Sequence, residues 1–166
     1  EHIERFQQSC RSVGIELPGV GDLHSRALEC AASGRTRHGG EDFNLVLLAT
    51  PGRLHTHTRQ PTLIMHTQSI AWDRLAQWYR AGQTLTISSI RSVPESCWSP
   101  KIKTRARLHY YLADQEALAH SRDPHSAGLL LDQHGFVSET SSANVLILEG
   151  ERLISPRREM ILDGIS

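Results

Sequence analysis

The chain has 166 residues, of which 39% are hydrophobic and 22% charged, so it can bury a core and does not have the composition of a disordered chain. Its 18 basic and 18 acidic residues cancel, which argues against a nucleic-acid or anionic-membrane partner. No apolar run approaches the ~20 residues of a membrane-spanning helix. The sequence therefore predicts a soluble, cytoplasmic protein.

The first half of the chain alternates predicted helices and strands. In chain order we expect helices over 1–15, about 22–32 and 72–80, and strands over 43–49, 62–66 and 84–90. Asp22 is a plausible N-cap for the second helix, and Ser33-Gly34 is expected to end it and to open a loop. The continuous apolar run FNLVLLA is typical of a buried strand.

The second half opens with a proline-containing loop over 92–100 and the strongest helical pattern of the chain, over 104–120. Short strands with turn signals follow, which predicts a meander over 128–132, 136–139, 144–149 and 152–155. The pattern changes near residues 80–92. We therefore predict a small N-terminal α/β domain over 1–88 and a larger β-rich domain over 89–166.

Neither the cysteines nor the histidines predict a metal centre. The three cysteines, Cys10, Cys30 and Cys97, are odd in number and lack CxxC spacing, which argues against a disulfide framework or a zinc knuckle. His55 and His57 would lie on one face of a strand and could bind a metal, but no third ligand is identifiable. We therefore predict no metal site.

The first candidate catalytic residue is one of only two lysines, Lys101 and Lys103. Lys103 follows the proline-containing loop and precedes the long predicted helix. A lysine at such a junction can be partly desolvated, which lowers its pKa and makes its amine nucleophilic. Lys103 therefore has the position that an imine-forming lysine needs. The alternative is a solvated surface lysine.

The second candidate site is the run FVSETSSANVLIL, over 136–148. Glu139 supplies one negative charge and is surrounded by small polar side chains, which let backbone amides approach a ligand closely. We expect Ser142 and Asn144 to bind the same ligand. A polar β-turn without a ligand is the alternative.

Two further stretches bear on the site. At the end of the chain, Gly164, Ile165 and Ser166 stand where a helix might begin, and their N–H groups and hydroxyl suit an oxyanion such as phosphate. The stretch RARLHYYLAD, over 105–114, is unusually polar and aromatic. Some of its side chains could face the site, but packing of this helix face on the neighbouring domain is the preferred interpretation.

Together these stretches resemble the class IV pyridoxal-phosphate (PLP) aminotransferases, a family that includes branched-chain aminotransferases, D-amino-acid aminotransferases and aminodeoxychorismate lyases. The matching stretches follow the order and spacing of the family: EHIERF, IKTRARLHYYLADQEA, LLLDQHGFVSETSSANVLIL and LISPRREMILDGIS. The resemblance implies a two-domain α/β fold of type IV, with a small N-terminal domain and the start of a larger β-rich, pseudo-barrel domain. Because family chains are longer, we expect a fragment that lacks both ends and does not fold alone.

The resemblance also implies a role for individual residues. Lys103 falls on the family's Schiff-base lysine, and Glu139 on the glutamate that pairs with the pyridine nitrogen of PLP. Arg5 falls on the arginine that binds the cofactor phosphate. Ile165 and Ser166 fall on an Ile-Thr pair that also holds the phosphate, with Ser in place of Thr.

The activity implied by the resemblance is transfer of an amino group from an amino acid to a 2-oxo acid, by a homodimer that uses PLP. Leu108 stands five residues after Lys103, where branched-chain aminotransferases have Tyr, and this argues against that branch. An aminodeoxychorismate lyase that forms 4-aminobenzoate is the alternative enzyme. A non-catalytic scaffold is the other alternative, which the presence of Lys103, Glu139 and Arg5 together disfavours. The sequence does not identify the donor, the acceptor or the L or D stereochemistry.

Overall fold

The structure is a computed structural model that describes residues 1–17, 23–53 and 60–165. The chain divides into two compact units, Glu1–Ala76 and Gln77–Ser166, and the division falls within α3 (Trp72–Ala81). The domain boundary between residues 88 and 89 stays a prediction for the whole protein.

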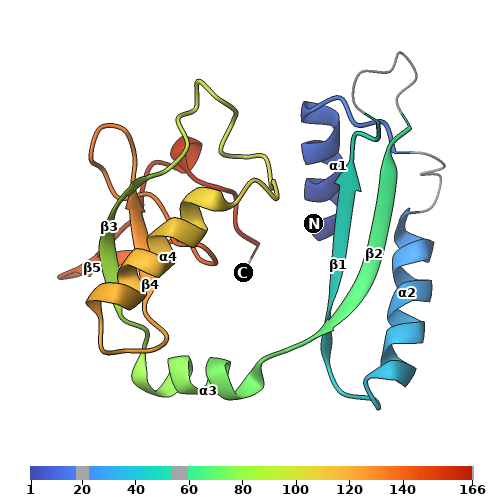
Figure 1. Ribbon diagram of the computed structural model, residues 1–166, viewed down its shortest axis with the longest axis horizontal. Helices are drawn as coiled ribbons and strands as arrows, with labels where there is room; N and C mark the ends of the chain where they lie inside the picture. The colour runs from blue at the N-terminus through green and yellow to red at the C-terminus, as the bar shows by residue number, and fades with distance from the viewer. Residues whose placement is uncertain (18–22, 54–59, 166) are drawn as a thin grey trace. The chain divides into compact units, whose positions relative to one another are not determined.

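The first unit packs a helix on an antiparallel pair of strands. Its elements are α1 (His2–Ser12), α2 (Leu23–Arg37), β1 (Phe43–Thr50) and β2 (Thr62–Ser69). The two strands pair along their full length, and α2 packs on both of them (Figure 1). The opening helix and both strands are where the sequence predicted them.

Helix α2 does not end at Gly34, as the sequence predicted, but continues to Arg37. A glycine in a helix interior costs about 0.5–1 kcal/mol relative to alanine. Here it allows a close approach, because a Cβ on Gly34 would lie 2.5 Å from Thr67 Cγ2 and 2.9 Å from the Phe43 ring. Tertiary packing therefore overrides the stop signal. Asp22, the predicted start of this helix, lies outside the described residues.

The second unit contains a parallel strand pair joined by a helix. β3 (Leu85–Arg91) and β4 (Ala127–Leu131) pair in parallel, and α4 (Leu108–His120) connects and covers them (Figure 1). Parallel strands require such a crossover connection. A short antiparallel hairpin follows, formed by β5 (Ile147–Glu149) and β6 (Arg152–Ile154), and then the 3₁₀ helix η2 (Arg158–Met160).

Small residues let α4 approach β4 closely. Ala113 and Ala117 of α4 are fully buried, and so is Leu130 of β4. A Cβ on Gly128 would lie 2.6 Å from the backbone carbonyl of Ala113. The core of this unit therefore lies between α4 and the parallel strands.

Two predictions for the second unit need correction. The meander holds only in part: 130–132 pairs antiparallel with 136–139 as predicted, but β4 also pairs in parallel with β3, which a meander does not include. The Asp132 carboxylate accepts the N–H groups of His134 and Phe136 in the turn that joins these two segments. Helix α4 begins at Leu108 rather than at 104.

The late start of α4 has a local cause. Thr104 Oγ1 accepts the backbone N–H of Ala106 at 3.1 Å. A side-chain hydrogen bond of this kind competes with helix formation. The helix therefore begins four residues later than the sequence pattern predicts, which places Tyr110 in its first turn.

Candidate active site

The parallel strand pair brings the two main candidate residues together. Lys103 lies in the connection from β3 to α4, and Glu139 lies in the segment that follows β4. Both connections leave the carboxyl ends of paired parallel strands, which is the edge where ligands bind in open α/β sheets. Lys103 and Glu139 line one open pocket together with Arg107, His109, Tyr110, Met160 and Leu162.

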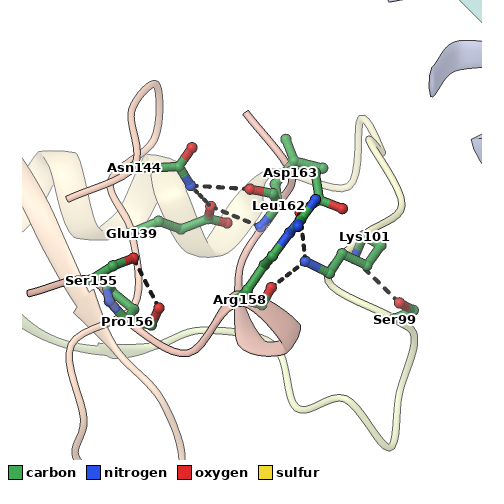
Figure 2. Close-up of polar contacts among 9 residues, drawn as sticks. All are labelled: Ser99, Lys101, Glu139, Asn144, Ser155, Pro156, Arg158, Leu162 and Asp163. Atoms are coloured by element: carbon green, nitrogen blue, oxygen red, sulfur yellow. Dashed lines mark hydrogen bonds and ion pairs between the residues drawn. The ribbon is translucent and has the colours of Figure 1, made fainter. Parts of the chain in front are cut away.

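The half-buried Glu139 carboxylate accepts hydrogen bonds from three segments of the chain. The Tyr110 hydroxyl donates to Oε1 at 2.5 Å. The Leu162 N–H donates to Oε2 at 3.3 Å, and Asn144 Nδ2 donates to the same oxygen at 3.4 Å (Figure 2). Asn144 Nδ2 also donates to the Leu162 carbonyl at 3.1 Å. Hydrogen bonds of this kind stabilise a charged carboxylate.

The backbone around Glu139 is also fixed. The Leu130 N–H of β4 donates to the Glu139 carbonyl at 3.1 Å. Thr140 Oγ1 accepts the N–H groups of Ser142 and Ala143 at 3.4 and 3.0 Å. The hydroxyl-rich run therefore builds a turn, as the alternative interpretation expected, and this turn also presents the Glu139 carboxylate to the pocket. Ser142 is exposed on it.

Tyr110 is enclosed by charged and polar neighbours. The Arg107 guanidinium lies over its ring, 4.5 Å from the centroid, and donates to the Ser141 carbonyl. The His109 ring lies 4.0 Å from the Tyr110 ring, centroid to centroid. Burial and the contact with Glu139 raise the pKa of Tyr110, so its hydroxyl stays a neutral donor. Burial and the Arg107 charge lower the pKa of His109.

Arg107, His109 and Tyr110 belong to the polar stretch for which packing on a neighbouring domain was the preferred interpretation. The structure supports the other interpretation for these three, because they line the pocket with Lys103. A signal in the sequence could have identified them. They are polar residues at the start of the helix that follows the candidate lysine, where an apolar packing face would be expected.

The two lysines have different surroundings. Lys101 Nζ lies 2.8 Å from Asp163 Oδ1 and donates to the Arg158 carbonyl, and Arg158 Nε lies 3.0 Å from the same carboxylate oxygen (Figure 2). Hydrogen bonds from Lys101 and Arg158 lower the pKa of Asp163. Lys103 lines the pocket and is exposed, so the expected desolvation at this junction is not observed.

The C-terminal segment lies against Asn144. A Cβ on Gly164 would collide with Asn144 Oδ1, so a larger residue here would displace the Asn144 side chain. Ile165 follows and is half-buried, and neither residue is helical. Ser166, the other predicted phosphate contact, lies outside the described residues.

Arg5 belongs to the first unit, where it is a half-buried residue of α1. The residues that line the pocket all belong to the second unit. The predicted contact between Arg5 and a phosphate therefore stays a prediction, as does any ligand contact of Ser142.

Other features bear on the excluded classes. Residues 1–17, 23–53 and 60–165 contain no group of three or more His, Cys, Asp or Glu residues placed to hold a metal ion. His55 and His57 lie outside those ranges. The three cysteines are free thiols. None of the described helices is long and apolar enough to cross a membrane.

Solved structures share the architecture of this chain. It superposes with a TM-score of 0.77 on the T.th. branched-chain amino acid aminotransferase complexed with N-(5'-phosphopyridoxyl)-L-glutamate, at 22% identity, over 99% of this chain and 52% of that one. The Thermobaculum terrenum branched-chain amino acid aminotransferase in its PLP form gives 0.75 at 21% identity, over 99% and 53%. These likenesses confirm the predicted α/β fold of type IV.

The sequence shows the family. The model of the class IV aminotransferases matches residues 1–166, so the chain belongs to that family. It is also 22% identical over 166 residues to a "Probable branched-chain-amino-acid aminotransferase" of Rickettsia bellii (strain RML369-C). The matched region is 100% of this chain and 56% of that relative. The chain therefore spans about half the length of the relatives that it matches.

Proposed function

We propose that this protein is a PLP-dependent aminotransferase that moves an amino group from an amino acid to a 2-oxo acid. The observation that carries the proposal is the pocket that holds the Lys103 amine together with the hydrogen-bonded Glu139 carboxylate. Membership of the class IV family and the PLP-containing structural relatives support it. A homodimer in the cytoplasm, with a domain boundary near residue 88, is part of the same proposal.

The residues of the pocket fit PLP chemically. Glu139 has about four lone-pair sites on its carboxylate, and three described donors leave room for one more, such as the protonated pyridine nitrogen. Lys103 lines the same pocket and has a primary amine, the group that a PLP anchor requires. The cofactor phosphate would be held by the backbone around Ile165, by Ser166 and by Arg5. Ser142 and Asn144 would make further contacts with the cofactor. When bound, PLP supplies an electron sink for the substrate Cα.

Each of the two main residues has a distinct task. Glu139, as an anion, keeps a ring nitrogen protonated at its side of the pocket. Lys103 Nζ would hold the cofactor through its primary amine, and it would act as the base for the proton on the substrate Cα. Lys101 does not line the pocket and pairs with Asp163, so neither task is assigned to it.

The test uses the full gene product mixed with PLP, reduced with borohydride and digested. Cleavage after Glu95 and Glu116 releases one peptide that holds both lysines, and fragmentation then locates the pyridoxyl mass. We expect the label on Lys103 and a visible cofactor band that bleaches when an amino donor is added. A label on Lys101, or one spread over surface amines, would contradict the proposal.

A matched pair of variants sharpens the test. Lys103→Arg should lose the label and the donor-dependent bleaching, and lower the rate of amino transfer by at least about 10²–10⁴-fold, because the amine that moves the proton is gone. Lys101→Arg keeps a cation for Asp163 and should behave as the wild type. A panel of amino donors and 2-oxo acids then identifies the substrates, while pyruvate release from aminodeoxychorismate without an acceptor would indicate the lyase.

A further inference from the structure

The three donors to the Glu139 carboxylate are not equivalent. Leu162 and Asn144 both donate to Oε2, at 3.3 and 3.4 Å. Tyr110 donates to the other oxygen, Oε1, at 2.5 Å. The terminal torsion of a glutamate is broad, so donors on a single oxygen do not fix the plane of the carboxylate. A short hydrogen bond on the second oxygen does.

The Tyr110 hydroxyl is itself held in place. Its ring lies under the Arg107 guanidinium, and Arg107 is tied to the Ser141 carbonyl in the turn that follows Glu139. Tyr110 also lies in the first turn of α4, which packs on β3 and β4. The Tyr110 donor therefore belongs to a packed helix, and the Glu139 acceptor belongs to the neighbouring turn.

We propose that Tyr110 is a positioning residue that fixes the plane of the Glu139 carboxylate and thereby directs its open lone pair into the pocket. This inference rests on the proposed role of Glu139 toward the pyridine nitrogen. Tyr110 itself does not need to touch the cofactor. Its contribution is preorganisation, because the carboxylate is already oriented before PLP binds.

The chain offers a matched pair of variants for the test. Tyr110→Phe removes only the hydroxyl and keeps an aromatic ring under Arg107. Tyr111→Phe removes the same group from the next residue of α4, where the side chain is exposed. Two readouts on the full gene product do not need turnover: the Kd of the apoprotein for PLP, and the induced circular dichroism of the bound cofactor, which reports how rigidly it is held.

We expect Tyr110→Phe to raise the Kd for PLP about tenfold, equivalent to about 1.4 kcal/mol, which matches a lost hydrogen bond to a charged group that is partly exposed. The induced dichroism should weaken as well. Tyr111→Phe should change neither readout by more than about twofold, a difference below about 0.4 kcal/mol. Equal behaviour of the two variants would overturn the inference.

A double-mutant cycle separates positioning from a general structural role. In a Glu139→Ala background there is no carboxylate to orient, so Tyr110→Phe should add less than about a twofold change in Kd. A full tenfold effect in that background would mean that Tyr110 acts without Glu139, and would overturn the inference. If the wild type binds PLP and Glu139→Ala weakens it while Tyr110→Phe does not, this inference alone fails. If the wild type binds no PLP, the proposed function fails and the inference with it.

Discussion

In both units a glycine lets a helix approach a pair of strands closely. In one unit the glycine belongs to the helix, and in the other it belongs to a strand. In the first unit Gly34 belongs to the helix, and the atoms that it approaches are the side chains of Phe43 and Thr67. In the second unit Gly128 belongs to the strand, and it approaches the backbone of Ala113. A side chain can change its rotamer, whereas the backbone of a packed helix cannot move by itself. The second interface should therefore tolerate less change.

The units also differ in how their strands are connected. β1 and β2 are antiparallel, so they exchange a complete ladder of backbone hydrogen bonds. β3 and β4 are parallel, and the segments that leave their carboxyl ends carry Lys103 and Glu139. Side-chain hydrogen bonds to Glu139, together with a few backbone hydrogen bonds between Leu130 and residues 138–139, hold the segment after β4 in place. The candidate site is thus built where regular structure ends, on a scaffold that is closely packed underneath.

The largest expected effect tests the packing comparison directly. Gly128→Ala should lower the free energy of unfolding by about 1–3 kcal/mol, as overpacking does, because the new Cβ meets the Ala113 carbonyl. Gly34→Ala should cost less, because Thr67 and Phe43 can rotate and alanine recovers about 0.5–1 kcal/mol of helix preference. Urea unfolding of the full gene product, followed by circular dichroism, measures both. A larger loss for Gly34→Ala would reverse the comparison.

A smaller loss of stability is expected at the ion pair that Lys101, in the loop after β3, forms with the C-terminal segment. Lys101→Met removes one of the two cations that bind Asp163, but the Lys101 and Asp163 side chains are partly exposed, so the loss of stability should stay below about 1 kcal/mol. It should shrink further in ~1 M salt, where charges are screened within about 3 Å. Lys101→Arg is the control that keeps the charge. A loss that does not depend on salt would mean that packing, rather than charge, makes this contact.

The same pair predicts a dependence on pH. Lys101 and Arg158 lower the pKa of Asp163 in the folded protein, so its contribution to stability is complete above the ordinary aspartate pKa. The contribution is lost as the pH falls through the lowered value. The difference in melting temperature between the wild type and Lys101→Met should therefore be constant above about pH 4 and decrease below it.

The sequence predicted the regular elements of both units better than it predicted their contacts. The run 128–132 is apolar and short, and nothing in it indicates a second, parallel partner, so the meander predicted the antiparallel pairing with 136–139 but missed the parallel pairing with β3. Gly34 has the form of a helix stop because its fit against Thr67 exists only in the folded unit. In both cases the deciding interaction is remote in sequence.

The candidate site shows the same limit. Lys103 and Glu139 could be predicted because they stand in recognisable stretches, and the structure places them in one pocket. Tyr110 could not, because its position depends on where α4 begins. That start is set by the Thr104 side chain, which holds back the first turn.

The smallest expected effect is a shift in the titration of His109, whose ring lies against Tyr110 and whose pKa responds to two charged neighbours. Burial lowers the pKa of His109 first, Arg107 lowers it further, and Glu139 raises it. Glu139→Gln should therefore move the midpoint down and Arg107→Gln should move it up, each by less than about one pH unit because the site is partly open to water. The Cε1 proton of His109 reports both midpoints by NMR. Shifts of the same sign in the two variants would mean that Arg107 and Glu139 do not act on His109 in opposite directions. The pocket would then differ from the arrangement on which the role of Tyr110 depends.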